Sequence, residues 1–147
     1  MSGLAQLFAG VNFQSTIQRY CGLQGWSIAD LNPNTAVLRF GMESGRTQIL
    51  YVLKFDATLE FSVQSDLRFD SVDAVPGYLS TLLLKRNCEK KIGFWCLEEI
   101  GSKHIFSHMH NAEMSLIDGD YFAKVVRALI REVDELEEVI FGIGRRH

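Results

Sequence analysis

The connections between the strand-like segments of residues 26–64 are too short to join anything but neighbouring antiparallel strands. Only brief runs of turn-forming residues, such as Asn32-Pro33-Asn34, separate these segments. A parallel pair would need a crossover of about a dozen residues or more. The sequence therefore predicts an antiparallel sheet, with strands over residues 26–29, 35–42, 46–55 and 58–64.

Two of these strands carry informative side-chain patterns. Residues 58–64 alternate strictly, so Leu59, Phe61 and Val63 are predicted to point inward, with the polar residues between them outward. Residues 46–55 are apolar on both faces, which is typical of a central strand. The alternation predicts a sheet with one buried face along residues 58–64.

Three helices are predicted around the sheet. The first covers residues 13–23 with Asn12 as its N-cap, and residues 3–9 are a candidate extension of it. The second follows Asp73, its predicted cap, with Pro76 in the first turn and one apolar stripe of Tyr78, Leu79, Leu82 and Leu83. The last covers residues 119–140, is capped by Asp118, and has one apolar and one acidic face.

Three more strands are predicted between the second and third helices, at residues 92–98, 103–109 and 112–117. The resulting order is helix, three or four strands, helix, three strands, helix. Helices grouped around antiparallel strands favour the α+β class over α/β. We expect a single domain over residues 1–147, with its core at about 13–140 and a short flexible tail at 141–147.

The composition limits the kinds of partner. The net charge of −3 and pI of about 5.8 lack the basic footprint that nucleic-acid binding needs. The basic run 85–91 is interpreted as a solvated helix end. No segment approaches the roughly 20 apolar residues of a membrane span, and residues 1–11 do not form a signal peptide. Three cysteines without paired spacing favour a reduced, cytoplasmic setting.

The segment 103–110 holds the most distinctive side chains. His104, Phe106, His108 and His110 share one face if the segment is a strand. Only His108 and His110 are close enough to share a metal ion, and no carboxylate or thiol completes the set, so no metal is predicted. We expect a solvent-facing polar strand face. The second interpretation is a partner-binding face formed by His104, Phe106 and His108.

No catalytic signature emerges. The loop 41–47 departs from a phosphate-binding loop in spacing and in the element that follows, and is interpreted as a hairpin loop. Cys96 could meet His104 or His108 across adjacent strands, although its position suggests a buried, inert thiol. We predict no enzyme and no cofactor. The alternatives left open are a small metal- or thiol-dependent enzyme using His108, His110 and Cys96, and a ligand-sensing domain with a pocket between sheet and helix.

The whole pattern resembles a known bacterial fold. Trp26 opening the first strand, the run Val75-Pro76-Gly77-Tyr78-Leu79 with Asn87, Gly93-Phe94-Trp95, and Leu116-Ile117-Asp118 leading through Phe122 into an acidic helix carry the resemblance. It is to the class I type III secretion chaperones and the YbjN family, from about Phe13 to Ile140. The resemblance implies a curved antiparallel sheet with helices packed on it, commonly a homodimer. It also implies a protein partner or client, bound in a chaperone-like or regulatory role.

Overall fold

The computed structural model of the chain describes residues 2–142, which form three α-helices, six strands and two short 3-10 helices. In chain order these elements are α1 (Ser2–Gln24), β1 (Asp30–Asn32), β2 (Thr35–Gly41), β3 (Thr47–Phe55), β4 (Thr58–Phe69), η1 (Val72–Ala74), α2 (Gly77–Glu89), β5 (Phe94–Ile100), β6 (Lys103–Glu113), η2 (Met114–Leu116) and α3 (Gly119–Phe141).

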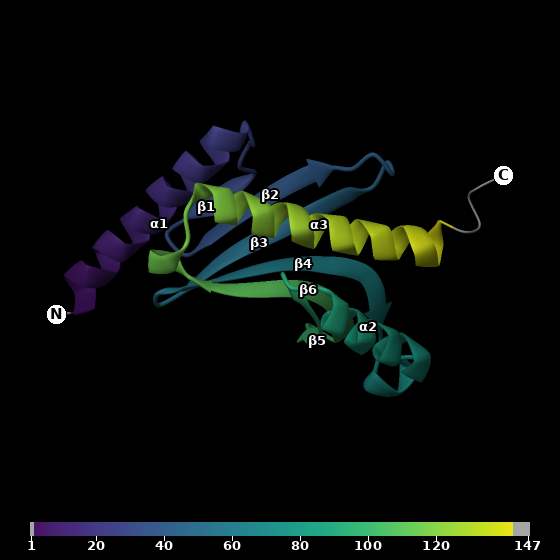
Figure 1. Cartoon of the computed structure of the whole chain (residues 1–147). Helices are drawn as coiled ribbons and strands as arrows, with labels where there is room; N and C mark the ends of the chain where they lie inside the picture. The colour runs from purple at the N-terminus through teal and green to yellow at the C-terminus, as the bar shows by residue number, and fades with distance from the viewer. Residues whose placement is uncertain (1, 143–147) are drawn as a thin grey trace.

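The six strands form one open, antiparallel sheet in the order β1-β2-β3-β4-β6-β5. Figure 1 shows α3 lying across the front of the sheet, α1 beside the N-terminal end of α3, and α2 near β5. The predicted α+β class, the antiparallel sheet with helices packed on it and the order of elements are confirmed.

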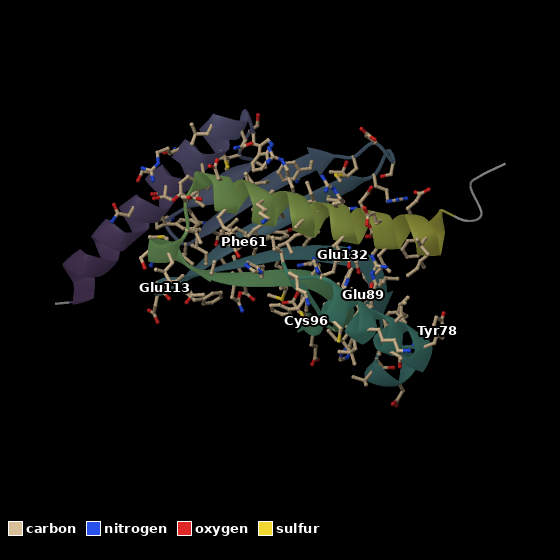
Figure 2. All side chains as sticks on the ribbon, in the orientation of Figure 1. Phe61, Tyr78, Glu89, Cys96, Glu113 and Glu132 are labelled. Atoms are coloured by element: carbon tan, nitrogen blue, oxygen red, sulfur yellow. The ribbon has the colours of Figure 1, made fainter. Side chains whose placement is uncertain are left out.

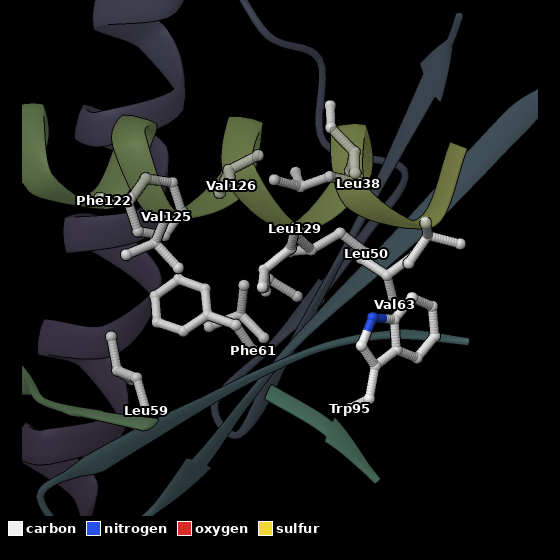
Figure 3. Close-up of a cluster of buried hydrophobic side chains, with 14 of the residues drawn as sticks. Leu38, Leu50, Leu59, Phe61, Val63, Trp95, Phe122, Val125, Val126 and Leu129 are labelled. Atoms are coloured by element: carbon white, nitrogen blue, oxygen red, sulfur yellow. The ribbon is translucent and has the colours of Figure 1, made fainter. Parts of the chain in front are cut away.

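The core lies between α3 and the sheet. Leu59, Phe61 and Val63 of β4 are fully buried there, as the alternation predicts. Phe61 packs against Phe122 of α3 with ring centroids 5.5 Å apart. Figure 3 shows the apolar residues of α3 meeting those of β2, β3, β4 and β5. The predicted N-cap of this helix is confirmed, since the Asp118 carboxylate accepts a hydrogen bond from Tyr121 N at 2.8 Å.

An ion-pair network fixes α2 and β5 against α3. The buried Glu132 carboxylate accepts hydrogen bonds from Arg86 of α2 and from the Trp95 indole of β5. Burial raises the pKa of Glu132, but the hydrogen bonds from Arg86 and Trp95 outweigh it and hold the pKa below its ordinary value. Figure 2 shows Glu132 on α3 where this helix passes α2. The three elements are thereby held in one arrangement.

The first and the last of the four strands predicted over residues 26–64 differ from the prediction. Residues 26–29 are not a strand, because Trp26 is used for packing: its ring lies 5.3 Å from that of Phe40 and under the Arg127 guanidinium. β4 runs past residue 64 to Phe69, because a bulge between Gln64 and Arg68 lets it continue its pairing with β6.

The segments predicted as separate strands at 103–109 and 112–117 form one strand, β6, which ends at Glu113. The turn expected at His110-Asn111 is absent because both residues pair with β4, His110 opposite Phe61 and Asn111 opposite Glu60. Long-range pairing therefore outweighs the turn preference of Asn111.

The predicted helix caps before α1 and α2 are wrong. Asn12 lies inside α1, which begins at Ser2, so the candidate extension of this helix is confirmed. Ser71, not Asp73, caps the short helix η1, and Pro76 occupies the N-cap position of α2. Of the predicted apolar stripe of α2, Tyr78 and Leu82 are exposed. Of the tail predicted at 141–147, residues 143–147 lie outside the described part of the chain.

Candidate protein-binding face

Strand β3 has apolar side chains on both faces of the sheet, but only one face is covered. Leu50 and Val52 point toward α3 and are fully buried in the core. Ile49, Tyr51 and Leu53 point the other way, are half-buried, and do not belong to the core or pack against it. Within residues 2–142, the helices lie on the Leu50 side of the sheet.

We call this uncovered side of the sheet the open face. By strand register it is formed by Thr35, Val37, Arg39, Thr47, Ile49, Tyr51, Leu53, Phe55, Thr58, Glu60, Ser62, Gln64, Arg68, Phe94, Cys96, Glu98, Ile100, Lys103, Ile105, Ser107, Met109, Asn111 and Glu113.

A row of directly paired residues crosses the open face. Val37 lies opposite Tyr51, Tyr51 opposite Ser62, Ser62 opposite Met109, and Met109 opposite Phe94. Paired residues of antiparallel strands project to the same side. At roughly 4.8 Å per strand, the row spans about 19 Å. It is apolar at every position except Ser62.

The centre of the open face is shielded although no helix packs on it. Ser107 and Met109 are almost fully buried, and Met109 lies outside the core cluster. Tyr51 is half-buried, and 37% of the surface of Phe94 is exposed to solvent. The open face thus offers apolar surface along the row around a shielded centre.

Charges of both signs lie on the open face: the carboxylates of Glu60, Glu98 and Glu113, and the basic side chains of Arg39, Arg68 and Lys103. Glu98 accepts a hydrogen bond from the Ser107 hydroxyl at 2.5 Å. Burial raises the pKa of Glu60, and the negative charge of Glu98 raises it further. Among residues 2–142, neither Glu60 nor Glu98 forms an ion pair with a basic side chain. Glu60 and Glu98 are therefore half-buried carboxylates on a face of mixed charge.

The residues singled out on β6 lie on the other side of the sheet. His104, Phe106, His108 and His110 share one face, as predicted, but this face is turned toward the helices and the expectation of a solvent-facing polar surface is wrong. Phe106 and His108 are 4% and 1% exposed, because Trp95 and the helix layer cover this part of β6. Of the three candidate partner-binding residues, only His104 is accessible to a partner in this structure.

The two central histidines have distinct surroundings. Both ring nitrogens of His108 lack a hydrogen-bond partner, and burial lowers its pKa to about 4. His110 accepts a hydrogen bond from Gly93 N at 3.1 Å, and its other nitrogen lies 3.1 Å from the Tyr121 hydroxyl. In the described part of the chain, no group of three or more His, Cys, Asp or Glu residues could hold a metal ion.

Cys96 lies on the open face and not in the core, so the predicted burial within the core is wrong. Its sulfur is 3.1 Å from that of Met109, and burial raises its pKa to about 11. His104 and His108 project from the opposite face of the sheet, so the Cys–His pairs considered from the sequence do not form. A thiol with this pKa remains protonated near neutral pH and is a poor nucleophile.

One cavity of about 520 Å³ lies between the segment after α2 and the outer side of α3. Lys90, Lys91, Lys124 and Arg131 line it together with Glu132 and Glu135. The cavity lies outside the sheet–helix interface, where the alternative of a ligand-sensing domain would place its pocket, and the two acids offset part of its positive charge.

None of the described helices has the combination of length and hydropathy required to cross a membrane.

The sequence contains one signal for the open face. Residues 46–55 are apolar on both faces, which was interpreted as a central strand. The strand is central in the sheet, but the second apolar face is the uncovered one. Contiguous apolar patches on a protein surface are candidate interaction sites, so the open face is the candidate here.

Comparison with solved structures identifies the same fold in two proteins. A chain of the HopA1–SchA chaperone–effector complex aligns with a TM-score of 0.64 and 6% identity, covering 89% of this chain and 97% of that one. YbjN of E. coli, which has been proposed to be a transcription regulator, aligns with a TM-score of 0.60 and 16% identity, covering 86% and 91%. Comparison with protein-family models and with curated protein sequences gives no match. The predicted resemblance is therefore confirmed at the level of the fold.

Proposed function

We propose that the protein is a non-enzymatic, cytoplasmic protein-binding module, chaperone-like or regulatory, that holds its partner on the open face. The observation that carries this proposal is the apolar row from Val37 to Phe94, which lies outside the core on the uncovered side of the sheet. The fold shared with a chain of a chaperone–effector complex supports a protein as the partner.

Capture from native extract tests the proposal. The wild-type protein should enrich a specific protein, and Tyr51→Glu should lose it, because a charge placed in the apolar row must be desolvated on binding. Lys124→Glu is the matched control, since Lys124 is an exposed residue of α3 on the other side of the molecule. Equal enrichment by the wild type and Tyr51→Glu would contradict the assignment of the face.

We further propose that the protein is a homodimer in which α2 lies in the interface. Tyr78 and Leu84 of α2 are 77% and 64% exposed, and Ile100 at the end of β5 is 39% exposed. Figure 2 shows Tyr78 projecting away from the body of the molecule. Exposed apolar side chains grouped on one helix are typical of a subunit interface.

Light scattering coupled to size exclusion tests the dimer. We expect twice the chain mass for the wild type and the chain mass for Leu84→Glu, because the charge would be buried without a partner in the interface. Far-UV circular dichroism of the variant should be unchanged, since Leu84 is exposed in one chain. A wild-type protein that is monomeric at micromolar concentration would overturn the dimer but leave the open-face proposal intact.

A further inference from the structure

We propose that the cavity between the end of α2 and the outer side of α3 binds a small organic molecule that carries a phosphate monoester, with Lys91 and Arg131 as cations that meet the phosphate. This inference goes beyond the proposed function, because none of the residues that line the cavity belongs to the open face.

The cavity is formed by two segments that are distant in the sequence. One wall is the segment 90–92, which directly follows α2. The other wall is a stripe of α3 whose residues are three or four positions apart, as side chains on one side of a helix are: Lys124, Ala128, Arg131 and Glu135. Figure 2 shows Glu89, the last residue of α2, near Glu132 of α3, where the two walls meet. The volume of about 520 Å³ is in the range of small-molecule sites.

The charges that line the cavity are unbalanced. Four basic side chains and two carboxylates line it, which leaves an excess of two positive charges. One of the carboxylates, Glu132, is already paired with Arg86, which does not line the cavity. The neighbouring Glu89 is exposed and does not line it either. The cavity therefore favours an anion that carries more than one charge.

Capping of α2 explains only part of this basic cluster. Lys91 Nζ donates a hydrogen bond to the carbonyl of Cys88 at 3.3 Å, as a lysine at the negative end of a helix dipole does, and its remaining N–H groups are available to a ligand. Lys124 and Arg131 belong to a different helix, and among residues 2–142 neither forms an ion pair. A guanidinium without an ion pair can bind a phosphate through two parallel hydrogen bonds.

The walls favour a small phosphate ester over other anions. Ile92, which packs against the core, and the half-buried Ala128 give the cavity apolar surface for the carbon part of a ligand. A nucleic-acid backbone would need a basic surface beyond the cavity, but five of the seven residues that follow Arg131 are acidic. A monocarboxylate would balance only one of the two excess charges. A phosphate monoester carries about two negative charges near neutral pH and balances both.

Isothermal titration calorimetry of the full chain at low salt tests the inference. The ligands are AMP, ribose 5-phosphate, adenosine and inorganic phosphate. We expect the esters to bind about tenfold more tightly than adenosine, which lacks the charge, and than inorganic phosphate, which lacks the carbon part. The preference for AMP or for ribose 5-phosphate identifies a nucleotide or a sugar phosphate as the ligand. Added salt should weaken the binding of both esters.

Two double variants of equal charge locate the site. Lys91→Gln/Arg131→Gln should bind the esters about tenfold more weakly, because two charge pairs at exposed positions are removed. Arg19→Gln/Lys85→Gln removes two exposed cations that do not line the cavity and should bind them like the wild type. Equal affinity of all three proteins, or absence of ester binding to the wild type at millimolar concentration, would overturn the inference. Inorganic phosphate or a glutamate-rich peptide that binds more tightly than either ester would overturn it as well.

Discussion

Two leucines on one strand give a direct test of which face of the sheet is packed. Leu50 and Leu53 both lie on β3, three residues apart, and project to opposite faces. Leu50 is fully buried in the core, whereas Leu53 is half-buried on the open face. The substitutions Leu50→Ala and Leu53→Ala remove the same atoms from the same strand, so the difference between their effects reports packing alone.

The magnitudes follow from the burial of each side chain. Leu50→Ala removes three buried carbons, at about 0.8 kcal/mol each, and leaves a cavity, so we expect a loss of about 3 kcal/mol in the free energy of unfolding. Leu53→Ala removes atoms that already contact solvent and leaves no closed cavity, so we expect a loss of about 1 kcal/mol or less.

The assay is urea unfolding followed by far-UV circular dichroism and by tryptophan fluorescence, with equal slopes required for the comparison. For a chain of this length, the Leu50→Ala change corresponds to about 10 °C in Tm. If Leu53→Ala costs as much as Leu50→Ala, the open face is packed in the free protein and is not available to a partner.

Three further predictions concern the helix side of the sheet. His108→Leu should reduce the loss of stability on acidification. The pKa of His108 is about 6.5 in the unfolded chain and about 4 in the folded chain, so the wild-type protein loses stability as the pH falls between these values. Denaturation curves at pH 7 and pH 4 measure the difference in the free energy of unfolding. Gly93→Ala should destabilise the protein by about 3 kcal/mol, since φ is +85° and an added Cβ would lie 2.5 Å from His108 Cε1. Gly101→Ala is the control, because φ is +62° with open space around it, and should cost about 1 kcal/mol. A larger cost at Gly101 than at Gly93 in urea unfolding would refute the close-contact argument. Arg86→Met should cost about 2 kcal/mol at pH 7, because it removes the closer cation of the buried Glu132 carboxylate and leaves the Lys90 ammonium 3.8 Å away. The cost should be smaller at acid pH, where protonation removes the charge of Glu132, and an equal cost at neutral and acid pH would show that Arg86 acts through packing alone.

Local sequence patterns predict the parts of the fold that depend on local chemistry. The Asp118 cap and the amphipathic face of α3 need only a few neighbouring residues, and the strict alternation of residues 59–63 determines which side of β4 is buried. The errors occur where distant pairing decides. β6 continues through Asn111 because β4 supplies partners for it, and β4 continues past Gln64 through a bulge that no local signal indicates.

The candidate site was harder to predict for a related reason. Alternation shows that His104, Phe106 and His108 share a face, but not whether this face meets the helices or solvent. This depends on pairing with β4, which places His108 opposite the core residue Val63. Because histidine is polar, the sequence predicted that this face meets solvent. His108 is buried with neither ring nitrogen hydrogen-bonded, which is uncommon for a buried polar group, so its residue type gave the wrong prediction.

Photo-cross-linking from the open face tests the central claim most directly. A photoreactive phenylalanine derivative replaces Tyr51 in one variant and Lys124 in another, and each protein is irradiated in native extract. We expect a discrete cross-linked product between position 51 and a second polypeptide, identified by mass spectrometry, and none from position 124. Products formed from position 124 alone would contradict the claim that the open face holds the partner.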